Sequence, residues 1–591
     1  MIRPWNRVFA HKQFLFTALV ALLAAAPVLA SAATEETATQ VDKVFADLQE
    51  PGSPGCALGV FRNGQIIYSK GYGLASVELD APITPQTVFD IGSTSKQFTA
   101  ASILLLEQQG KLSINDDVRK YIPELPDYSK SGGTKITILN LLNHTSGLRD
   151  YLGLLGMAGI NGDSVTTDDD ALALITRQKN LTFAPGSEWR YSNTGFFLLS
   201  VIVKRVSGMT LREFASKNIF QPLQMTHTNF RDDHTVLIPH RALAYDPDGK
   251  NGYKLDLSYF EQSGDGAVHT SVEDLAKWDE NFYSAQIGGK SSLTEIQERG
   301  KLNNGKTLQY AKGLFILDYR GLRAVRHGGA WGGYRAELLR FPEQHFSVAC
   351  LCNLANATPG KRADKVAEIY LGGLMKPKQT TAAPTENPNA PVGVILNPAQ
   401  LGALKGTYRD AAKGTIARIS EAEGKLQWEI YGSKFGLTAL SPTQFSPINF
   451  PLDAKITFEL DGNDTARQMK VGGDEEIAAT YQRVAEFAPS TEELAAYVGD
   501  FKSDELAVVY RVQIVDGKLN LATISDNAGI PRTGVPMPSA LRPTISDEFE
   551  IPSEGVDIDF TKDARNHIIG FDLDAEGTHG IQFVRIAQVA R

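Results

Sequence analysis

The sequence has few cysteines, no excess of positive charge and, beyond residue 32, no long hydrophobic run. Its 591 residues contain three cysteines, too few for a disulfide framework. The formal charge is −9, so the chain lacks the basic footprint of a nucleic-acid-binding protein and we expect no nucleic-acid partner. No stretch after residue 32 has the length of a membrane-spanning helix.

Motifs for metal ligands are also missing. Cys350 and Cys352 lie in the run 347–353, whose composition is typical of a buried strand. Residues two apart on a strand share a face, so we expect both to pack as small apolar groups. The chain contains no His-Glu-x-x-His motif, and its histidines are scattered. We therefore expect no metal and no cofactor.

The first 32 residues have the pattern of a signal peptide. A basic start with Arg3 and Arg7 precedes an apolar run over 14–29 and then Ala30-Ser31-Ala32. The alternative is a retained anchor, but the run is short and no basic stop-transfer segment follows it. We expect cleavage after Ala32 and an exported protein, periplasmic or secreted, without a stable membrane anchor.

Length and composition predict several globular domains. Within 33–375, strand patterns occur at 56–61 and 65–68 and again at 313–318, 336–341 and 346–351, while helical patterns cover 41–48, 97–109, 138–142 and 196–207. Strands at both ends of this segment indicate one antiparallel sheet with a helical layer, an α+β fold.

The remainder of the chain contains a linker and a repeat. Residues 376–397 are rich in proline, threonine and alanine, as in an extended linker. The segments 398–487 and 488–591 then share the pattern Leu-x-x-Leu/Tyr-x-Gly-x-Tyr/Phe, which begins at Leu401 and at Leu494. Short alternating runs in both segments predict two small all-β barrels or sandwiches.

The strongest chemical motif is Ser93-x-x-Lys96 at the start of the helix expected over 97–109. Residues three apart on a helix lie on one face. A serine hydroxyl needs a nearby base to act as a nucleophile, and a buried lysine can be that base. The alternative is a helix cap followed by a solvated lysine, which fits less well before the apolar run 98–106.

Two further motifs are weak when taken alone. Tyr191 and Asn193 lie two residues apart before the helix expected over 196–207, so they can point the same way and act on a proton and on a substrate amide. The alternative is a packed loop. The stretch His327-Gly328-Gly329-Ala330 combines a residue that titrates near neutral pH with glycines that allow close approach to a ligand. The alternative here is a glycine-rich hairpin.

Together the three motifs resemble the serine β-lactamase and penicillin-binding protein superfamily, especially its class C-like branch, over residues 37–373. Supporting stretches include Leu141–Leu148, Phe183–Gly186 and Gly264–Gly266. The resemblance implies that Ser93 forms an acyl-enzyme, that Lys96 and Tyr191 manage its proton, and that the N–H groups of Ser93 and Ala330 form the oxyanion hole. Asn193, His327, Gly328 and Gly329 would then bind substrate. Tyr191 is also the candidate for activating water in the second step.

The departure from the family pattern is His327-Gly328-Gly329 where class C enzymes carry Lys-Thr-Gly. A histidine is mostly neutral at pH 7, which argues against binding of a penicillin carboxylate there. His-x-Gly and two C-terminal β-barrels are features of the D-aminopeptidases of the family, one of whose barrels sends a loop into the active site. The proline-rich segment 527–547 is the candidate for such a loop here.

These observations favour a serine peptidase or amidase that acts on a peptide or small-molecule substrate, such as a D-amino-acid amide. The alternatives are a carboxylesterase, a β-lactamase, and a non-catalytic penicillin-binding sensor, which would need a broken motif. His144 follows an apolar helix, and we expect it to form structural hydrogen bonds rather than to take part in catalysis.

Overall fold

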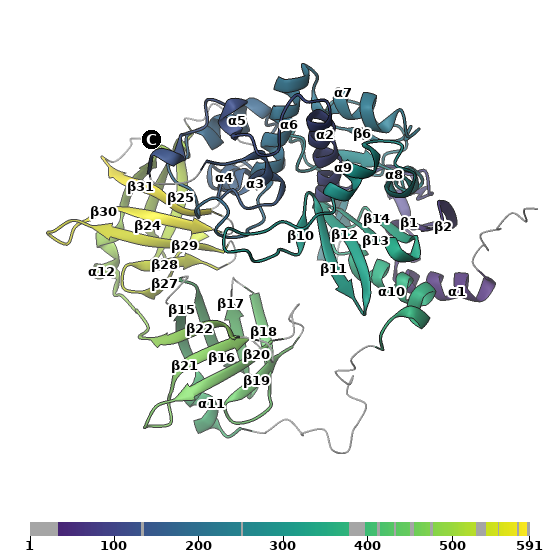
Figure 1. Cartoon of the computed structure of the whole chain (residues 1–591). Coiled ribbons are helices and arrows are strands. Elements are labelled where there is room, and N and C mark those ends of the chain that lie inside the picture. Colours follow the sequence, from purple (N-terminus) through teal and green to yellow (C-terminus); the bar gives the residue numbers. More distant parts are fainter. Residues whose placement is uncertain are drawn as a thin grey trace, which may run out of the picture.

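The strands expected at 56–61 and 65–68 are neighbours in a seven-stranded antiparallel sheet in the computed structural model, joined by a turn at Asn63-Gly64. The structure describes residues 34–587 except 132–134, 250–251, 378–395, 411–413, 431–432, 449–453, 473–476, 527–538, 553–554 and 576–577. The strand order is β10-β11-β12-β13-β14-β1-β2, so the first and last strands of the unit are neighbours in space, as predicted (Figure 1). The strands are β1 (Cys56–Arg62), β2 (Gln65–Tyr72), β10 (Tyr310–Ala311), β11 (Leu314–Tyr319), β12 (Leu322–Trp331), β13 (Tyr334–Phe341) and β14 (Phe346–Cys352).

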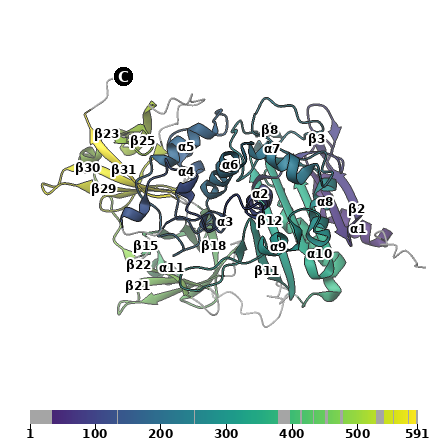
Figure 2. The same ribbon diagram turned by 45° about the horizontal axis from the view of Figure 1, so that its top comes forward.

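Helices cover both faces of this sheet, not a single face. On one face, α1 and α10 enclose a core that contains Val41, Phe45 and Val366. On the other face, α2 and α6 lie side by side beneath the rest of the helical layer (Figure 2). The helices are α1 (Glu35–Val44), α2 (Lys96–Gln108), α3 (Ile138–Leu142), α4 (Tyr151–Met157), α5 (Asp168–Thr176), α6 (Asn193–Ser207), α7 (Leu211–Ala215), α8 (Val272–Ser284), α9 (Gly289–Glu295) and α10 (Pro359–Leu371). Small sheets pair β3 (Leu74–Ser76) with β4 (Ala81–Pro82), β7 (Tyr245–Pro247) with β8 (Tyr253–Leu255), and β9 (Val268–Thr270) with both β5 (Phe89–Asp90) and β6 (Asn229–Phe230).

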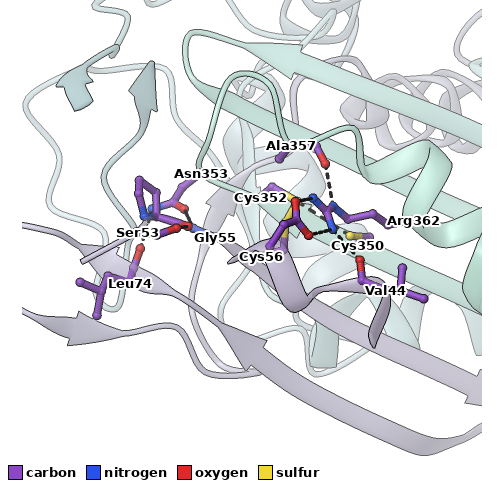
Figure 3. Close-up of a disulfide and its surroundings, with 12 residues drawn as sticks. Val44, Ser53, Gly55, Cys56, Leu74, Cys350, Cys352, Asn353, Ala357 and Arg362 are labelled. Atoms are coloured by element: carbon purple, nitrogen blue, oxygen red, sulfur yellow. Dashed lines mark hydrogen bonds and ion pairs between the residues drawn. A yellow bond between two sulfur atoms is a disulfide. The ribbon is translucent and has the colours of Figure 1, made fainter. Parts of the chain in front are cut away.

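A disulfide joins Cys56 and Cys352, so the expectation that Cys352 packs only as a small apolar group was wrong. The two residues are direct partners in the β1–β14 register although 296 positions separate them in sequence (Figure 3). Such pairing depends on which strands are neighbours, and cysteine spacing cannot show that. Cys350 keeps a free, fully buried thiol, whose pKa burial raises to about 12.

The two repeats form two β units of different closure. The first is a closed barrel of eight strands, and the second is a nine-stranded sheet with order β26-β25-β24-β23-β31-β30-β29-β28-β27, which is nearly closed. The first unit contains α11 (Pro398–Leu404), β15 (Gly406–Asp410), β16 (Ile416–Ala422), β17 (Lys425–Ile430), β18 (Ser433–Ala439), β19 (Gln444–Pro447), β20 (Lys455–Leu460), β21 (Ala466–Gly472) and β22 (Ile477–Val484). The second contains α12 (Thr491–Leu494), β23 (Gly499–Ser503), β24 (Val508–Val515), β25 (Lys518–Asp526), β26 (Ser539–Ala540), β27 (Arg542–Ile545), β28 (Glu548–Ile551), β29 (Val556–Lys562), β30 (Ile568–Ala575) and β31 (Thr578–Ile586).

The repeated Gly and Arg positions have a common packing reason. In the barrel, a β-carbon on Gly406 would lie 3.1 Å from the guanidinium of Arg483, which donates to the carbonyls of the preceding helix. In the nine-stranded unit, a β-carbon on Gly499 would lie 2.8 Å from the guanidinium of Arg585. Each glycine therefore leaves room for an arginine on the last strand of its unit, and Arg585 donates to the carbonyls of Ala496 and Val498, which follow α12.

The nine-stranded unit packs tightly against the α+β domain expected over residues 33–375, the hydrolase-like domain. One continuous hydrophobic core extends from the helices of that domain into the nine-stranded sheet, whereas the barrel has a core of its own. The barrel is joined to the nine-stranded unit by ion pairs between Arg418 and Glu550 and between Arg542 and Glu429. The candidate loop 527–547 lies mostly outside the described residues, since its described part begins at Ser539. That part forms β26 and β27, and its Arg542 faces the barrel.

Within the described ranges, no single helix is long and apolar enough to cross a membrane. One bent pair, 193–207 with 211–220, passes the same test by length and composition, with a bend of 74°. The residues of the expected signal peptide lie outside the described part of the chain.

Candidate active site

Ser93 lies in a short 3-10 turn, Gly92–Ser95, that leads directly into α2. The spacing of three places the Lys96 amine above the Ser93 hydroxyl, with 3.0 Å between Nζ and Oγ. Lys96 is fully buried. The solvated lysine of the alternative interpretation is therefore absent.

Two carbonyl oxygens fix the orientation of the Lys96 amine. Nζ donates to Oδ1 of Asn193 at 2.9 Å and to the backbone oxygen of Asp265 at 2.6 Å. Both partners only accept hydrogen bonds, so they require two N–H groups. The remaining substituent position of the Lys96 nitrogen faces the Ser93 hydroxyl. An ammonium would donate an N–H to the hydroxyl there, and a neutral amine would accept the hydroxyl proton with its lone pair.

Tyr191 and Asn193 reach the same point from the loop that enters α6. The backbone N–H of Asn193 donates to the carboxylate of Asp150 at 2.5 Å, which anchors the start of the helix. The Lys96 nitrogen lies 4.9 Å from the centre of the Tyr191 ring, so it faces the ring and not the hydroxyl. That hydroxyl is buried and has no hydrogen-bond partner among the described residues. No hydrogen bond joins the Tyr191 hydroxyl to Ser93 in the described structure.

Strand β12 supplies the wall opposite the serine. A β-carbon on Gly329 would lie 1.8 Å from the carbonyl oxygen of Ile91, so only glycine lets the strand pack against the turn of Ser93. A β-carbon on Gly92 would lie 2.6 Å from the nitrogen of Ala330, which places this backbone N–H beside the serine turn. A β-carbon on Gly328 would instead point toward Glu337 on the other side of the strand. Gly328 therefore does not face the site.

His327 lies behind the site, contrary to the expectation that it binds substrate. Its ring is buried, Nε2 lies 3.2 Å from the hydroxyl of Tyr310, and Nδ1 lies 2.6 Å from the carbonyl oxygen of Gly328. Burial first, and then the charge of Lys96, lower the pKa of His327 to about 3. The imidazole is therefore neutral at pH 7, with both nitrogens bonded inside the protein, because only Nδ1–H can donate to a carbonyl.

His144 matches its structural interpretation. Its Nδ1 accepts the N–H of Ser192 at 3.2 Å, and its ring packs 4.2 Å from that of Tyr191. Burial lowers the pKa of His144 well below the usual value, so the ring is neutral. His144 thus fixes the loop that carries Tyr191.

Two buried carboxyl groups flank the amine. Burial raises the pKa of Asp265 to about 6, and the nearby Lys96 opposes this shift. Burial also raises the pKa of Asp150, against hydrogen bonds from the backbone of Asn193 and of α4. Asp265 accepts from the Tyr151 hydroxyl at 3.1 Å. These groups hold the loop around Lys96 in place.

A cleft of about 150 Å³ opens over Ser93. Tyr191, Asn193 and Ala330 line it with Ser93, and Arg231 lies on its wall. Two nitrogens of the Arg231 guanidinium donate to the carbonyls of Ser258 and His234. The cleft therefore combines a nucleophile, an amide and a backbone N–H group.

No set of metal ligands lies in this cleft among the described residues. In the described part of the chain, the one ligand set besides Cys56, Cys350 and Cys352 is Asp233, His234 and Glu261, and the His234 ring is already hydrogen-bonded to Glu261 at 2.7 Å.

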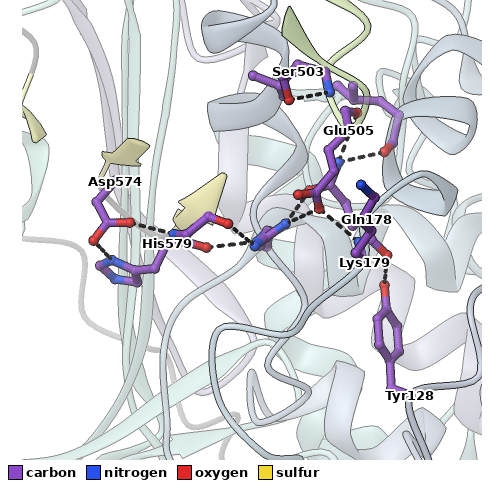
Figure 4. Close-up of polar contacts among 11 residues, drawn as sticks. Tyr128, Gln178, Lys179, Ser503, Glu505, Asp574 and His579 are labelled. Carbon is purple, nitrogen blue, oxygen red and sulfur yellow. Dashed lines mark hydrogen bonds and ion pairs between the residues drawn. The ribbon is translucent and has the colours of Figure 1, made fainter. Parts of the chain in front are cut away.

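Sequence reasoning missed two features of the site. The first is the hydrogen bond from Lys96 to the backbone oxygen of Asp265. Asp265 lies in Gly264–Gly266, a stretch that supports the family resemblance, but any residue type can offer a backbone oxygen, so the sequence cannot indicate this contact. The other is the buried ion pair between Arg149, which precedes α4, and Glu505 of the nine-stranded unit, which is labelled in Figure 4. Its partners are 356 residues apart, and no local signal links them.

Comparison with known proteins identifies the family of the chain. The family model named Beta-lactamase matches residues 41–371, more than half of the chain. The chain belongs to the Beta-lactamase family. It is 29% identical to penicillin-binding protein 4* of Bacillus subtilis over 439 residues, which cover 71% of this chain and 93% of that protein. It is 28% identical to the D-aminopeptidase of Gluconobacter oxydans over 375 residues, 63% of this chain and 66% of that one.

The chain is also similar to protein flp of Staphylococcus aureus, strain N315, at 28% identity over 54% of this chain and 64% of that protein. Among solved structures, the octameric penicillin-binding protein homologue from Pyrococcus abyssi matches with a TM-score of 0.51 and 24% identity. The match covers 76% of this chain and 99% of that one, and it shows the shared fold. The predicted superfamily and fold class are thereby confirmed.

Proposed function

We propose that this protein is an exported serine hydrolase that cleaves amide or ester bonds through an acyl-enzyme on Ser93. The observation that carries the proposal is the 3.0 Å contact between the Ser93 hydroxyl and a lysine amine whose other neighbours are two carbonyl acceptors. This arrangement allows the amine to take the proton as the hydroxyl attacks a carbonyl.

In the acylation step the Ser93 oxygen forms a bond to the substrate carbonyl carbon. The hydroxyl proton passes to Lys96, and the N–H groups of Ser93 and Ala330 stabilise the negative oxygen. Collapse of this intermediate breaks the bond to the leaving group, which receives a proton from Lys96 directly or through the Tyr191 hydroxyl. Asn193 positions the substrate amide.

In the deacylation step, water attacks the acyl carbon, the bond between that carbon and the Ser93 oxygen breaks, and the proton that the water loses passes through the Tyr191 hydroxyl to the Ser93 oxygen. The buried Tyr191 hydroxyl has no partner in the described protein, which is costly unless water or substrate completes its hydrogen bonds. It is thus the group we assign to activating that water.

Amides or peptides of D-amino acids are the favoured substrates. The similarity to a D-aminopeptidase supports this choice, as does the neutral His327 where a β-lactamase carries a lysine charge. Export to the periplasm or the medium is supported by the signal-like start and by the disulfide between Cys56 and Cys352, because such bonds persist in oxidising compartments.

The test compares the mature protein with Ser93→Ala and Lys96→Met on p-nitrophenyl acetate, D-alanine p-nitroanilide and nitrocefin. We expect the parent to hydrolyse the anilide, and both variants to lose at least about a thousandfold in kcat/KM. Equal activity of parent and Ser93→Ala on every substrate would reject the proposal. Turnover of nitrocefin alone would favour a β-lactamase, and turnover of the ester alone an esterase.

A further inference from the structure

We propose that a second cavity, between α4 and the nine-stranded unit, binds a large apolar group of the substrate. The cavity has a volume of about 560 Å³. That size lies within the range of small-molecule sites, whereas the cleft over Ser93 holds about 150 Å³. This inference rests on the proposed hydrolase function, because it assigns a subsite of the same active site.

The cavity adjoins the reacting groups directly. Tyr191 and Asn193 line both the cleft over Ser93 and the larger cavity. A substrate whose carbonyl lies at Ser93 therefore reaches the cavity past these two side chains. Asp150 also lines the larger cavity, and its carboxylate is held by the backbone N–H of Asn193.

The walls are mainly apolar and come from two parts of the chain. Leu521, Ile551, Val556 and Leu573 line it from the nine-stranded unit. The opposite wall is α4, where Gly156 lines the cavity and a β-carbon added to it would meet no atom within 4 Å. An apolar group that packs against these walls gains free energy because apolar surface is removed from water.

Fixed contacts keep this space open between the two parts. Beside the cavity, the Tyr510 hydroxyl of the nine-stranded unit donates to the carbonyl of Met157 at the end of α4. The buried pair of Arg149 and Glu505 holds the same two parts together. The nine-stranded unit thus selects the substrate, and the favoured substrates are amides or esters with a long acyl chain or an aromatic group beside the scissile bond.

The first test uses two ester series on the full chain: p-nitrophenyl esters with acetyl, butyryl and octanoyl groups, and acetyl esters of alcohols of growing apolar size. We expect kcat/KM to rise by up to about fourfold per added methylene in one of the two series, which identifies the side of the bond that enters the cavity. Flat profiles in both series would overturn the inference while leaving hydrolysis by Ser93 intact.

The second test uses Ala575→Trp, which fills the cavity from a partly buried position on β30, and Ile569→Trp as a matched control. Ile569 lies on the same strand and its side chain is 47% exposed. We expect Ala575→Trp to lower the ratio of kcat/KM for the largest to the smallest ester by about tenfold or more. The control should behave as the parent does.

A binding assay makes the result independent of turnover. The fluorescence of N-phenyl-1-naphthylamine, a neutral apolar probe, is measured with the Ser93→Ala protein. We expect binding that Ala575→Trp weakens at least about tenfold and Ile569→Trp leaves unchanged. Absence of binding, or equal binding by both tryptophan variants, would overturn the inference even if no ester were hydrolysed.

Discussion

Removal of the Glu505 carboxylate is expected to destabilise the contact between the hydrolase-like domain and the nine-stranded unit. In Glu505→Ala, Arg149 keeps its buried charge, since both side chains of the pair are only 1% exposed. The guanidinium retains hydrogen bonds to Gln178 and to the carbonyls of His579 and Gly580. Breaking a buried ion pair typically costs about 3–5 kcal/mol, and these remaining bonds favour the lower end, near 3 kcal/mol.

The assay is urea unfolding, combined with hydrogen exchange of peptides that cover 149–157 and 503–510. Glu124→Ala is the matched control, because Glu124 and Arg205 lie at the same N–O distance of 2.5 Å but are 37% and 36% exposed. Such a surface pair contributes about 1 kcal/mol or less. Equal losses in Glu505→Ala and Glu124→Ala would refute the reasoning.

The contact also bears on activity. The carbonyl of Arg149 accepts the Thr194 hydroxyl at 2.7 Å, and the next residue, Asp150, holds the backbone of Asn193. We therefore expect faster exchange in 149–157 of Glu505→Ala to be accompanied by a lower kcat/KM. Replacement of both partners, as Arg149→Met with Glu505→Leu, should cost less stability than Glu505→Ala alone.

Three further predictions concern stability. Cys352→Ala should lower the free energy of unfolding by about 2–5 kcal/mol, measured in urea without reductant. Cys350→Ala is the control, because it keeps the disulfide and its contribution to stability. If the parent and Cys352→Ala still differ by this amount when both are reduced, the loss does not come from the disulfide. His327 has a pKa of about 3 in the folded protein and of about 6.5 in the unfolded chain. Its contribution to the free energy of unfolding is therefore complete above about pH 6.5 and is lost as the pH falls toward 3, by up to ~1.4 kcal/mol per pH unit. His327→Gln should flatten unfolding midpoints measured over that range, and an unchanged slope would contradict the burial argument. Gly329→Ala should lower the free energy of unfolding by more than about 3 kcal/mol and remove most of the activity, because the added β-carbon meets the backbone of Ile91. A thermal unfolding midpoint equal to that of the parent would contradict this prediction, since it would show that the strand adapts.

The part of the site that the sequence predicted is local. The spacing of Ser93 and Lys96 fixes their contact through helix geometry alone, and the glycine at 329 marks the close approach of a strand. The strands at 56–61 and 65–68 and the two β repeats were predicted from strand patterns and alternation, which are also local signals.

What the sequence did not predict depends on distant partners. Cys352 meets Cys56 only because β1 and β14 are neighbours. His327 appeared suited to a substrate because its residue type titrates near neutral pH, but the Tyr310 hydroxyl and burial make it a neutral structural group. The large cavity exists only where α4 meets a sheet more than 350 positions later in the chain, as its contact between Met157 and Tyr510 illustrates.

The most direct measurement of the central claim is mass spectrometry of the protein quenched during turnover of p-nitrophenyl acetate, followed by peptide mapping. We predict one acetyl group, carried by Ser93, that accumulates in Tyr191→Phe more than in the parent and is absent from Lys96→Met. An acetyl group on another residue, or hydrolysis with no label on Ser93 in any of these proteins, would contradict the account.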